Sequence, residues 1–264
     1  MITSVSNSRV KQVVQLNTKS KARRESGLFT AEGLKLFREV PKQWVDSVYV
    51  TESFAKEHRE MLRGIDAELV DDKVFAKMCD TKTPQGILTV IKIPSYRRED
   101  LLGNGKTPFL MVLEDLQDPG NAGTILRTAE GAGVTGVILS KKTVDLFAPK
   151  TIRSTMGSIF RMPFVVEENL SEALDWLKLQ GVETYAAHLK GQHSYSEEDY
   201  RKGCAFLVGN EGNGLTEQLS ARADHLIRIP MEGQVESLNA SIAAAILMYT
   251  VHAQRNGCSS PRER

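Results

Sequence analysis

The sequence lacks the features that would assign it to a membrane, secreted or metal-binding class of protein. No apolar run approaches the roughly 18 residues that a spanning helix requires, and no signal peptide is recognisable at the amino end. The three cysteines, Cys79, Cys204 and Cys258, are an odd number without metal-like spacing. They indicate a reducing compartment and no disulfide framework. We therefore expect a soluble, cytoplasmic protein that contacts no membrane.

Histidine is also sparse, with five residues scattered along the chain. His188 and His193 lie near each other, but nothing in the sequence pairs with them to complete a metal site. We expect no bound metal.

The formal net charge is only +1, which does not by itself suggest a nucleic-acid partner. The charges are divided unevenly, however. Residues 1–108 hold 19 Lys or Arg and 14 Asp or Glu, and the remainder holds 15 and 19. One stretch carries six basic residues and no acidic one: Arg9, Lys11, Lys19, Lys21, Arg23 and Arg24. Such a run can contact RNA phosphates, although an exposed basic run is more often only solvated.

With 264 residues, 41% of them hydrophobic, the chain can bury one large core or two smaller ones. Helix and strand patterns alternate over residues 1–93 and predict a small α/β domain. Helices are expected over 7–16, 32–40, 52–62 and 72–78, and strands over 28–31, 45–50, 68–70 and 86–93. Residues 94–108 hold two prolines, two glycines and five charges, which is the composition of a linker.

Residues 109–264 predict a second α/β domain with a mainly parallel sheet, since its first strand, 109–114, is continuously apolar. Further strands are expected over 136–140, 164–166, 183–187, 205–208 and 225–229. Helices are expected from Gly120 or Asn121 to 131, after Pro149, over 170–179 and over 237–253.

Three polar, glycine-bearing segments follow strands of this second domain. Residues 114–123 read EDLQDPGNAG, residues 206–212 read FLVGNEG, and residues 229–239 end in Ser-Leu-Asn at the expected start of the last helix. Open α/β sheets bind ligands at the carboxyl ends of their strands. A dinucleotide-binding Rossmann domain is the competing interpretation, but Gly120-Asn-Ala-Gly123 does not fit the G-x-G-x-x-G fingerprint.

Taken in order, the three segments resemble the signature motifs of the SpoU/TrmH branch of the SPOUT RNA 2′-O-ribose methyltransferases, over most of residues 109–255. Residues 1–93 resemble the L30-like substrate-binding domain of such enzymes, and Thr81–Gly86 strengthens that match. The resemblance implies a carboxy-terminal trefoil knot whose loops form an S-adenosylmethionine pocket. One position departs from the family: the second motif reads Gly-Asn-Glu-Gly where Ala or Ser is commoner than Asn210.

The resemblance also implies the roles of individual residues. The expected cofactor-binding residues are Val208, Gly209, Asn210, Gly212, Ile229, Pro230, Met231 and Leu238. The expected catalytic residues are Arg127, Asn121, Glu211, Ser237 and Asn239. Core packing is the alternative role for the apolar members of these sets. Helix capping is the alternative role for Ser237 and Asn239, and it would explain Ser237 better than Asn239. Asn121 is expected in the loop or at the cap.

Arg127 is expected to act on the target 2′-hydroxyl. A general-base role has been proposed for this arginine in the family, but a guanidinium resists deprotonation. Holding the target phosphate or ribose and stabilising the developing alkoxide is the role we favour. The alternative is a surface ion pair with Glu130, three residues further along the helix.

The expected function is therefore methylation of a structured RNA, with 23S rRNA favoured over tRNA. A non-catalytic RNA-binding or ribosome-assembly factor of the same fold is the alternative from another class, and the intact motif side chains argue against it. The family usually forms homodimers through the catalytic domain. The last helix is compatible with this, because Ala240, Ala243–Ala245, Ile242, Ile246 and Leu247 make it apolar over much of its circumference. Coverage by the same subunit is the alternative.

Overall fold

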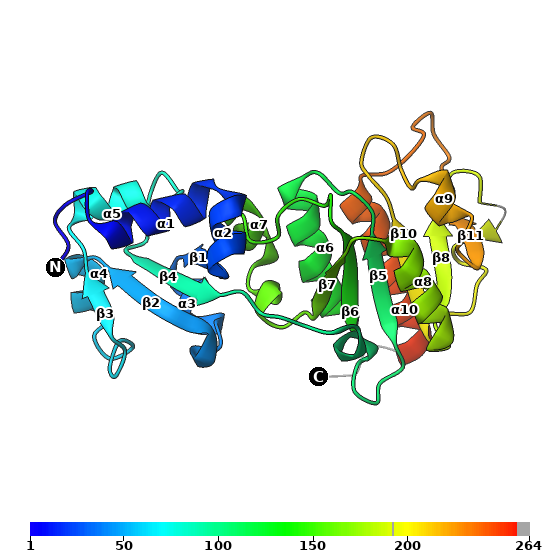
Figure 1. The fold of residues 1–264 in the computed structure, drawn as a ribbon. Coiled ribbons are helices and arrows are strands. Elements are labelled where there is room, and N and C mark those ends of the chain that lie inside the picture. The colour runs from blue at the N-terminus through cyan, green and yellow to red at the C-terminus, as the bar shows by residue number, and fades with distance from the viewer. Residues whose placement is uncertain (192, 258–264) are drawn as a thin grey trace. The chain divides into compact units, whose positions relative to one another are not determined.

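The computed structural model describes residues 1–191 and 193–257 and divides the chain into two compact units. The first unit contains residues 1–94 and 145–160, and the second contains residues 95–144 and those from 161 onward. Figure 1 shows the elements of both units. The boundary after residue 94 lies next to the expected one. Residues 145–160 differ from the expectation, because they lie in the sequence of the second domain yet pack with the first unit.

A four-stranded sheet in the order β1-β4-β2-β3 forms the centre of the first unit. Strands β1, β4 and β2 are antiparallel neighbours, whereas β3 pairs parallel with β2. The strands are β1 (Leu28–Glu32), β2 (Val45–Val50), β3 (Ala67–Leu69) and β4 (Ile87–Lys92). The helices are α1 (Ser8–Thr18), α2 (Ser20–Ser26), α3 (Leu34–Glu39), η1 (Lys42–Trp44), α4 (Glu52–Glu57), α5 (Asp72–Met78), α7 (Pro149–Thr155) and η3 (Ser158–Phe160).

Both faces of this sheet are covered, because side chains alternate between the faces along each strand. On one face Leu88 and Val90 pack with buried residues of α1 and α5. On the other face Ile87 packs with Val50 and with Phe54 of α4. The result is the small α/β sandwich that the alternating pattern of residues 1–93 predicts.

Residues 145–160 are held in the first unit by one buried ion pair and by aromatic packing. Arg23 is only 5% exposed, and it donates from Nε and Nη2 to Asp145 Oδ2 at 2.9 and 2.7 Å. The rings of Phe147 and Phe29 lie 4.8 Å apart. An unpaired guanidinium would be costly to bury, so Asp145 ties this segment to α2.

A sheet of seven parallel strands in the order β7-β6-β5-β10-β8-β11-β9 forms the centre of the second unit. The strands are β5 (Phe109–Leu113), β6 (Gly136–Ser140), β7 (Phe164–Glu167), β8 (Glu183–Ala187), β9 (His193–Ser194), β10 (Cys204–Val208) and β11 (His225–Arg228). The helices are η2 (Arg98–Leu102), α6 (Pro119–Ala132), α8 (Leu170–Leu179), α9 (Glu217–Ser220) and α10 (Ala240–Asn256).

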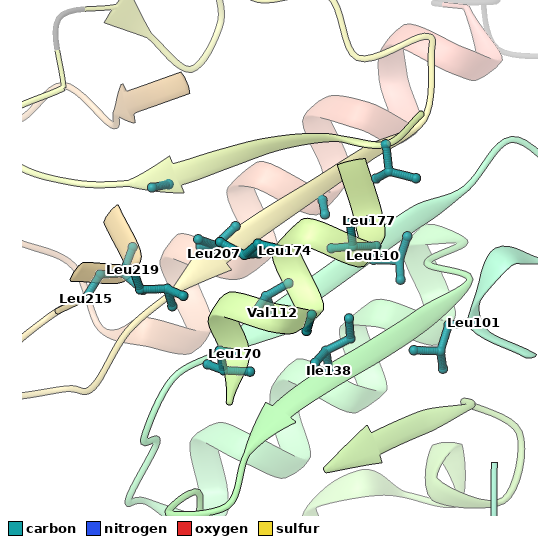
Figure 2. Packing of buried hydrophobic residues seen from close by; sticks show 14 residues of the cluster. Leu101, Leu110, Val112, Ile138, Leu170, Leu174, Leu177, Leu207, Leu215 and Leu219 are labelled. Carbon is teal, nitrogen blue, oxygen red and sulfur yellow. The ribbon is translucent and has the colours of Figure 1, made fainter. Parts of the chain in front are cut away.

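The sheet is buried on both faces, as parallel sheets generally are. Figure 2 shows Leu170, Leu174 and Leu177 of α8 lying over Val112 and Ile138 of the central strands. On the opposite face α10 packs against β10 and α6. All five residues of β5 and all five of β10 are buried. This double coverage explains why the two central strands read as uninterrupted apolar runs.

Two helix starts differ from the sequence expectation. Helix α6 begins at Pro119 with Asp118 as its cap, so Asn121 lies inside the first turn and not in the loop or at the cap. Helix α10 begins at Ala240, three residues later than expected, and Asn239 is its cap in place of Ser237. The Asn239 carboxamide accepts from Ser241 N at 2.9 Å and Ser241 Oγ at 2.7 Å. The trefoil knot implied by the resemblance stays a prediction.

Within the described part of the chain, no helix has the length and apolarity needed to cross a membrane. The same residues include no group of three or more His, Cys, Asp or Glu side chains placed to hold a metal ion. Cys79 and Cys204 are free thiols, and Cys258 lies outside the described residues.

Candidate active site

The pairing of β5 with β10 brings the first two glycine-bearing segments together. The two strands are parallel neighbours, and Leu113 is in register with Val208 at their carboxyl ends. The chain then leaves β5 toward the cap of α6 and leaves β10 into the loop at 209–216. Because parallel strands end at one edge, the polar residues that follow each strand lie beside each other. Glu114, for example, accepts from Thr216 N at 2.7 Å and from Thr216 Oγ1 at 2.8 Å.

Three predicted catalytic side chains form one hydrogen-bonded chain that links all three segments. Asn239 Nδ2 donates to Asn121 Oδ1 at 3.0 Å, and Asn121 Nδ2 donates to Glu211 Oε1 at 2.9 Å. The orientation of each carboxamide is fixed, because the oxygen of Asn239 also accepts from Ser241 and the carboxylate of Glu211 can only accept. The structure therefore brings Asn121, Glu211 and Asn239 together, as expected.

Glu211 is held as a carboxylate. Besides Asn121, the backbone N–H groups of Gln117 and Asp118 donate to it at 3.0 and 3.1 Å. Partial burial raises the pKa of Glu211, but the hydrogen bonds from Asn121 and the backbone outweigh burial and set the pKa below its ordinary value. The ionised side chain thus joins the second segment to the first turn of α6, where negative charge is favoured.

Asn210 is predicted from the sequence to bind the cofactor, but its side chain hydrogen-bonds to other groups of the protein. Its Oδ1 accepts from Gly212 N at 2.8 Å and Asn213 N at 3.1 Å, and its Nδ2 donates to the Asp115 carbonyl at 2.8 Å. Asp115 itself has a left-handed backbone, with φ 53°, which is uncommon for a residue other than glycine. Ser140 Oγ supports this conformation by donating to Asp115 Oδ1 at 2.7 Å. Asn210 is therefore a brace between the first two segments.

Gly209 is required by the protein's own backbone. A Cβ atom at this position would lie 2.1 Å from the Gly214 carbonyl carbon and 2.2 Å from Leu215 N. The loop folds back on itself there, with Asn210 N donating to Gly214 O at 3.0 Å. No side chain fits between two main chains this close. The main chain that approaches Gly209 closely is that of residues 214–215, and contact of Gly209 with the cofactor stays a prediction.

The third segment has the character of a binding loop. In the described part of the chain, residues 230–238 form no hydrogen bond with any other residue. Ile229, Met231 and Leu238 are half-buried, while Pro230 and Ser237 are exposed. An adenosyl group needs an apolar slot and free backbone N–H and C=O groups, and this segment offers both. The residues present therefore fit such a cofactor. Val208 ends β10, and Gly212 lies within the neighbouring loop at 209–216.

Arg127 is exposed on α6, and its side chain forms no hydrogen bond or ion pair with any described residue. The alternative of a pair with Glu130 is wrong, because Glu130 pairs with Arg161, whose Nη2 donates to Glu130 Oε2 at 3.0 Å. An arginine without a protein partner is available to an anionic or hydroxylated substrate. Its side chain does not belong to the Asn121–Glu211 chain of hydrogen bonds.

The basic run of the first unit is split between surface and interior. Lys11, Lys19, Lys21 and Arg24 are exposed, and Arg9 is exposed but pairs with Glu68. The expectation of an RNA contact is wrong for Arg23, which is buried against Asp145 and the Leu16 carbonyl. Sequence alone could not show this, because Asp145 lies 122 positions away.

Several residues of the first segment were missed as members of the site: Asp115, Gln117 and Asp118. One signal was available, since an Asp directly before a Pro is typical of a helix cap followed by its first turn. Asp118 Oδ1 indeed accepts from Asn121 N at 2.8 Å.

A parallel α/β sheet whose three polar loops are joined at its carboxyl edge by Asn121, Glu211 and Asn239 is the arrangement expected of a methyltransferase of the SPOUT class. The chain belongs to the SpoU rRNA Methylase family, which matches residues 108–249. Residues 7–89 match the MRM3-like substrate binding domain. The prediction of an RNA methyltransferase is thereby confirmed.

Relatives of known name support the same assignment over nearly the whole chain. The chain is 36% identical to the 23S rRNA (guanosine(2553)-2′-O)-methyltransferase RlmP of Bacillus subtilis, over 94% of this chain and 97% of that one. It is 32% identical to the uncharacterized tRNA/rRNA methyltransferase slr1673 of Synechocystis, over 98% and 96%.

Solved structures share the fold of the whole chain. The AdoMet-bound rRNA methyltransferase from Sinorhizobium meliloti has a TM-score of 0.85 and 33% identity, covering 98% of both chains. The SpoU methyltransferase AviRb from Streptomyces viridochromogenes in complex with AdoMet has a TM-score of 0.86 and 25% identity, covering 95% of this chain and 98% of that one. Two neighbours that hold AdoMet confirm the predicted cofactor at the level of the family.

Proposed function

We propose that this protein transfers a methyl group from S-adenosylmethionine to a ribose 2′-hydroxyl of 23S rRNA. The observation that supports it most directly is the chain of hydrogen bonds Asn239–Asn121–Glu211, which joins all three motif segments. The exposed Arg127 lies further along the helix that carries Asn121. The named relative in Bacillus subtilis, which matches 94% of this chain, is a methyltransferase of 23S rRNA that acts at a 2′-oxygen. That relative favours rRNA over tRNA as the substrate.

In this proposal the cofactor lies against the loops at 208–212, 229–231 and 237–239 and supplies an electrophilic methyl group. Ile229, Met231 and Leu238 exclude water from the adenosyl group, and the backbone of 230–238 supplies its hydrogen bonds. Asn239 caps α10, so Ser237 does not have that role. Ser237 is exposed, forms no hydrogen bond with described residues and is available to the cofactor or the RNA.

Arg127 acts on the RNA side of the reaction. Its guanidinium holds the phosphate or ribose of the target nucleotide and stabilises the charge that develops on the 2′-oxygen. Methyl transfer needs that oxygen in line with the methyl group, so most of the catalytic effect comes from positioning. Glu211, Asn121 and Asn239 fix the loops that set this geometry.

RNA binding outside the active site falls to the first unit. Lys11, Lys19, Lys21 and Arg24 are exposed there, and Arg9 can exchange Glu68 for a phosphate, since an exposed ion pair contributes little to stability. These contacts are insensitive to sequence and position the RNA.

A homodimer through the second unit is part of the same proposal. Ile242 and Tyr249 on α10 are each 50% exposed, and Ile246, half-buried, lies between them on the same helix face. The opposite face of α10, with Ala244, Leu247 and Val251, is fully buried in the subunit's own core. The core of the subunit covers only one face of α10. The exposed apolar stripe on the other face can pack against a second copy of the chain.

The test is to map ribose methylation in RNA from a strain that lacks the gene and from its parent. One 23S rRNA position should lose its 2′-O-methyl group and regain it when purified protein and S-adenosylmethionine are added to the unmodified RNA. Loss confined to tRNA would contradict the rRNA assignment, and no loss in any RNA would contradict the proposal as a whole.

A further inference from the structure

A cavity of about 570 Å³ lies in the first unit, and none of its lining residues is among those assigned to catalysis. It opens at the edge of the sheet where β2 ends and β4 begins, between α4 and α5. Its volume is within the range of small-ligand sites. All of its lining residues fall between Leu34 and Gly86, inside the part of the chain that matches the substrate binding domain.

The floor of the cavity is apolar and held rigidly. Phe54 and Phe75, 5% and 1% exposed, belong to the two cores that cover opposite faces of the sheet. The ring of His58 packs against Phe54, with ring centroids 4.3 Å apart and planes inclined by 51°. Pro84 and Ala76 complete the apolar lining. The two Phe rings are buried and support the lining, whereas the His58 side chain is 24% exposed and presents the aromatic surface on which a flat ligand could stack.

The rim of the cavity offers both a donor and acceptors. Gln85 Oε1 accepts from Leu34 N at 3.1 Å, which identifies the oxygen of this carboxamide. Its NH₂ group has no partner among residues 1–191 and 193–257 and remains a free donor. Glu57 and Asp72, both exposed, add carboxylate acceptors to the lining.

These groups discriminate between ligands. Two carboxylates repel phosphate, so the cavity is unsuited to an anionic group. They favour a ligand that carries N–H donors beside a ring acceptor. Unpaired RNA bases have this character, because their flat faces stack on aromatic side chains and their edges hydrogen-bond. Adenine, cytosine and guanine carry an exocyclic amino group for the carboxylates, whereas uracil does not.

We propose that this cavity binds one unstacked, amino-bearing base of the RNA substrate. The proposal rests on the proposed function, in which the substrate is an RNA. It gives the first unit a means of sequence recognition that the basic run lacks, since phosphate contacts position a protein on RNA and base contacts specify the sequence.

The first experiment blocks the cavity. Ala76 is an exposed residue of α5 that lines it, so Ala76→Trp fills the space without removing a hydrogen bond. Gln43→Trp is the matched control, because Gln43 is exposed in the same unit and does not line the cavity. Binding of unmodified 23S rRNA transcript should weaken roughly tenfold or more for Ala76→Trp, the range expected for losing one stacked base. Its affinity for S-adenosylmethionine and its turnover at saturating RNA should match wild type. Equal RNA affinity in Ala76→Trp and Gln43→Trp would overturn the proposal.

The second experiment does not depend on the folding of a tryptophan variant. A photo-crosslinking benzophenone side chain replaces Ser53, an exposed lining residue, and the full-length protein is irradiated with total RNA from a strain lacking the gene. We expect one dominant crosslinked nucleotide, unpaired and bearing A, C or G. Crosslinks spread over many positions, within duplexes or at uridine would contradict it.

The two proposals fail in different ways. If wild-type protein crosslinks to one unpaired base but transfers no methyl group, the cavity is confirmed and the proposed function is wrong. If wild-type protein methylates 23S rRNA while Ala76→Trp binds and methylates that RNA with wild-type constants, the function stands and the cavity assignment is wrong.

Discussion

Glu211 and Asn121 lie 90 positions apart in the sequence and are joined by a hydrogen bond of 2.9 Å between Asn121 Nδ2 and Glu211 Oε1. The carboxylate has no apolar packing of its own, and its further partners are backbone N–H groups at the start of α6. The first two loops are therefore joined through charge-assisted hydrogen bonds. Asn239 extends the connection to the third loop.

This connection makes stability depend on the ionisation of Glu211. Because its pKa is lowered in the folded protein, its contribution is fully present above the ordinary pKa of Glu, roughly 4.3, and is lost as pH falls through the folded value. The free energies of unfolding of wild type and Glu211→Gln should differ most near pH 7 and converge below about pH 4. Denaturant titrations across this range measure the difference. Glu217→Gln, at an exposed glutamate of α9 whose side chain forms no hydrogen bond with described residues, is the control for the loss of one carboxylate. A constant difference for Glu211→Gln would contradict the assignment.

Asn210 should matter through the loop it braces. Asn210→Ala removes its bonds to Gly212 N and Asn213 N and leaves the Asp115 carbonyl with one donor fewer. We expect a loss of about 1–3 kcal/mol in unfolding free energy and weaker binding of S-adenosylmethionine. Denaturant unfolding and calorimetry measure the two effects. Asn210→Asp keeps the acceptor and loses the donor, so its unfolding free energy should fall between those of Asn210→Ala and wild type. Asn213→Ala, at an exposed side chain in the same loop, is the control. Wild-type values for Asn210→Ala would contradict the brace.

Local pattern was sufficient wherever a strand or helix has one buried face and clear ends. Helix Leu170–Leu179 and strand Glu183–Ala187 have the bounds that the sequence predicts. Among the motif residues, Asn121, Glu211 and Asn239 come together as the ordered segments imply.

Two failures have a common physical origin. Ser237 and Asn239 are both good caps, and local propensity cannot choose between them. Asn121, 118 positions away, favours Asn239 as the cap. Its Oδ1 accepts from Asn239 Nδ2, while the Oδ1 of Asn239 caps α10. Arg23 looks like its exposed neighbours in the basic run until Asp145, 122 positions away, packs against it. Long-range partners decided both positions, and no local pattern records them.

The exposed apolar stripe on α10 predicts self-association. Ile242→Glu places a charge at a side chain that is 50% exposed in the single chain but would be buried between two copies. Light scattering at micromolar concentration should give twice the 29.3 kDa chain mass for wild type and the chain mass itself for Ile242→Glu. Leu179→Glu, at a residue of α8 that is 84% exposed, should remain dimeric and serve as the matched control. A wild-type mass near that of one chain with full activity would show that the dimer is not needed.

The most direct test of the account separates cofactor binding from methyl transfer at Arg127. The variant Arg127→Ala is compared with wild type by calorimetric titration of S-adenosylmethionine and by single-turnover transfer of labelled methyl to unmodified 23S rRNA. Arg222→Ala, at another surface arginine of the same unit, which pairs with Asp175 at 3.2 Å, is the control for loss of one positive charge. The account predicts that Arg127→Ala binds the cofactor like wild type and loses methyl transfer by a factor on the order of a hundred or more, while Arg222→Ala keeps both. Methyl transfer by Arg127→Ala at the wild-type rate would contradict the account.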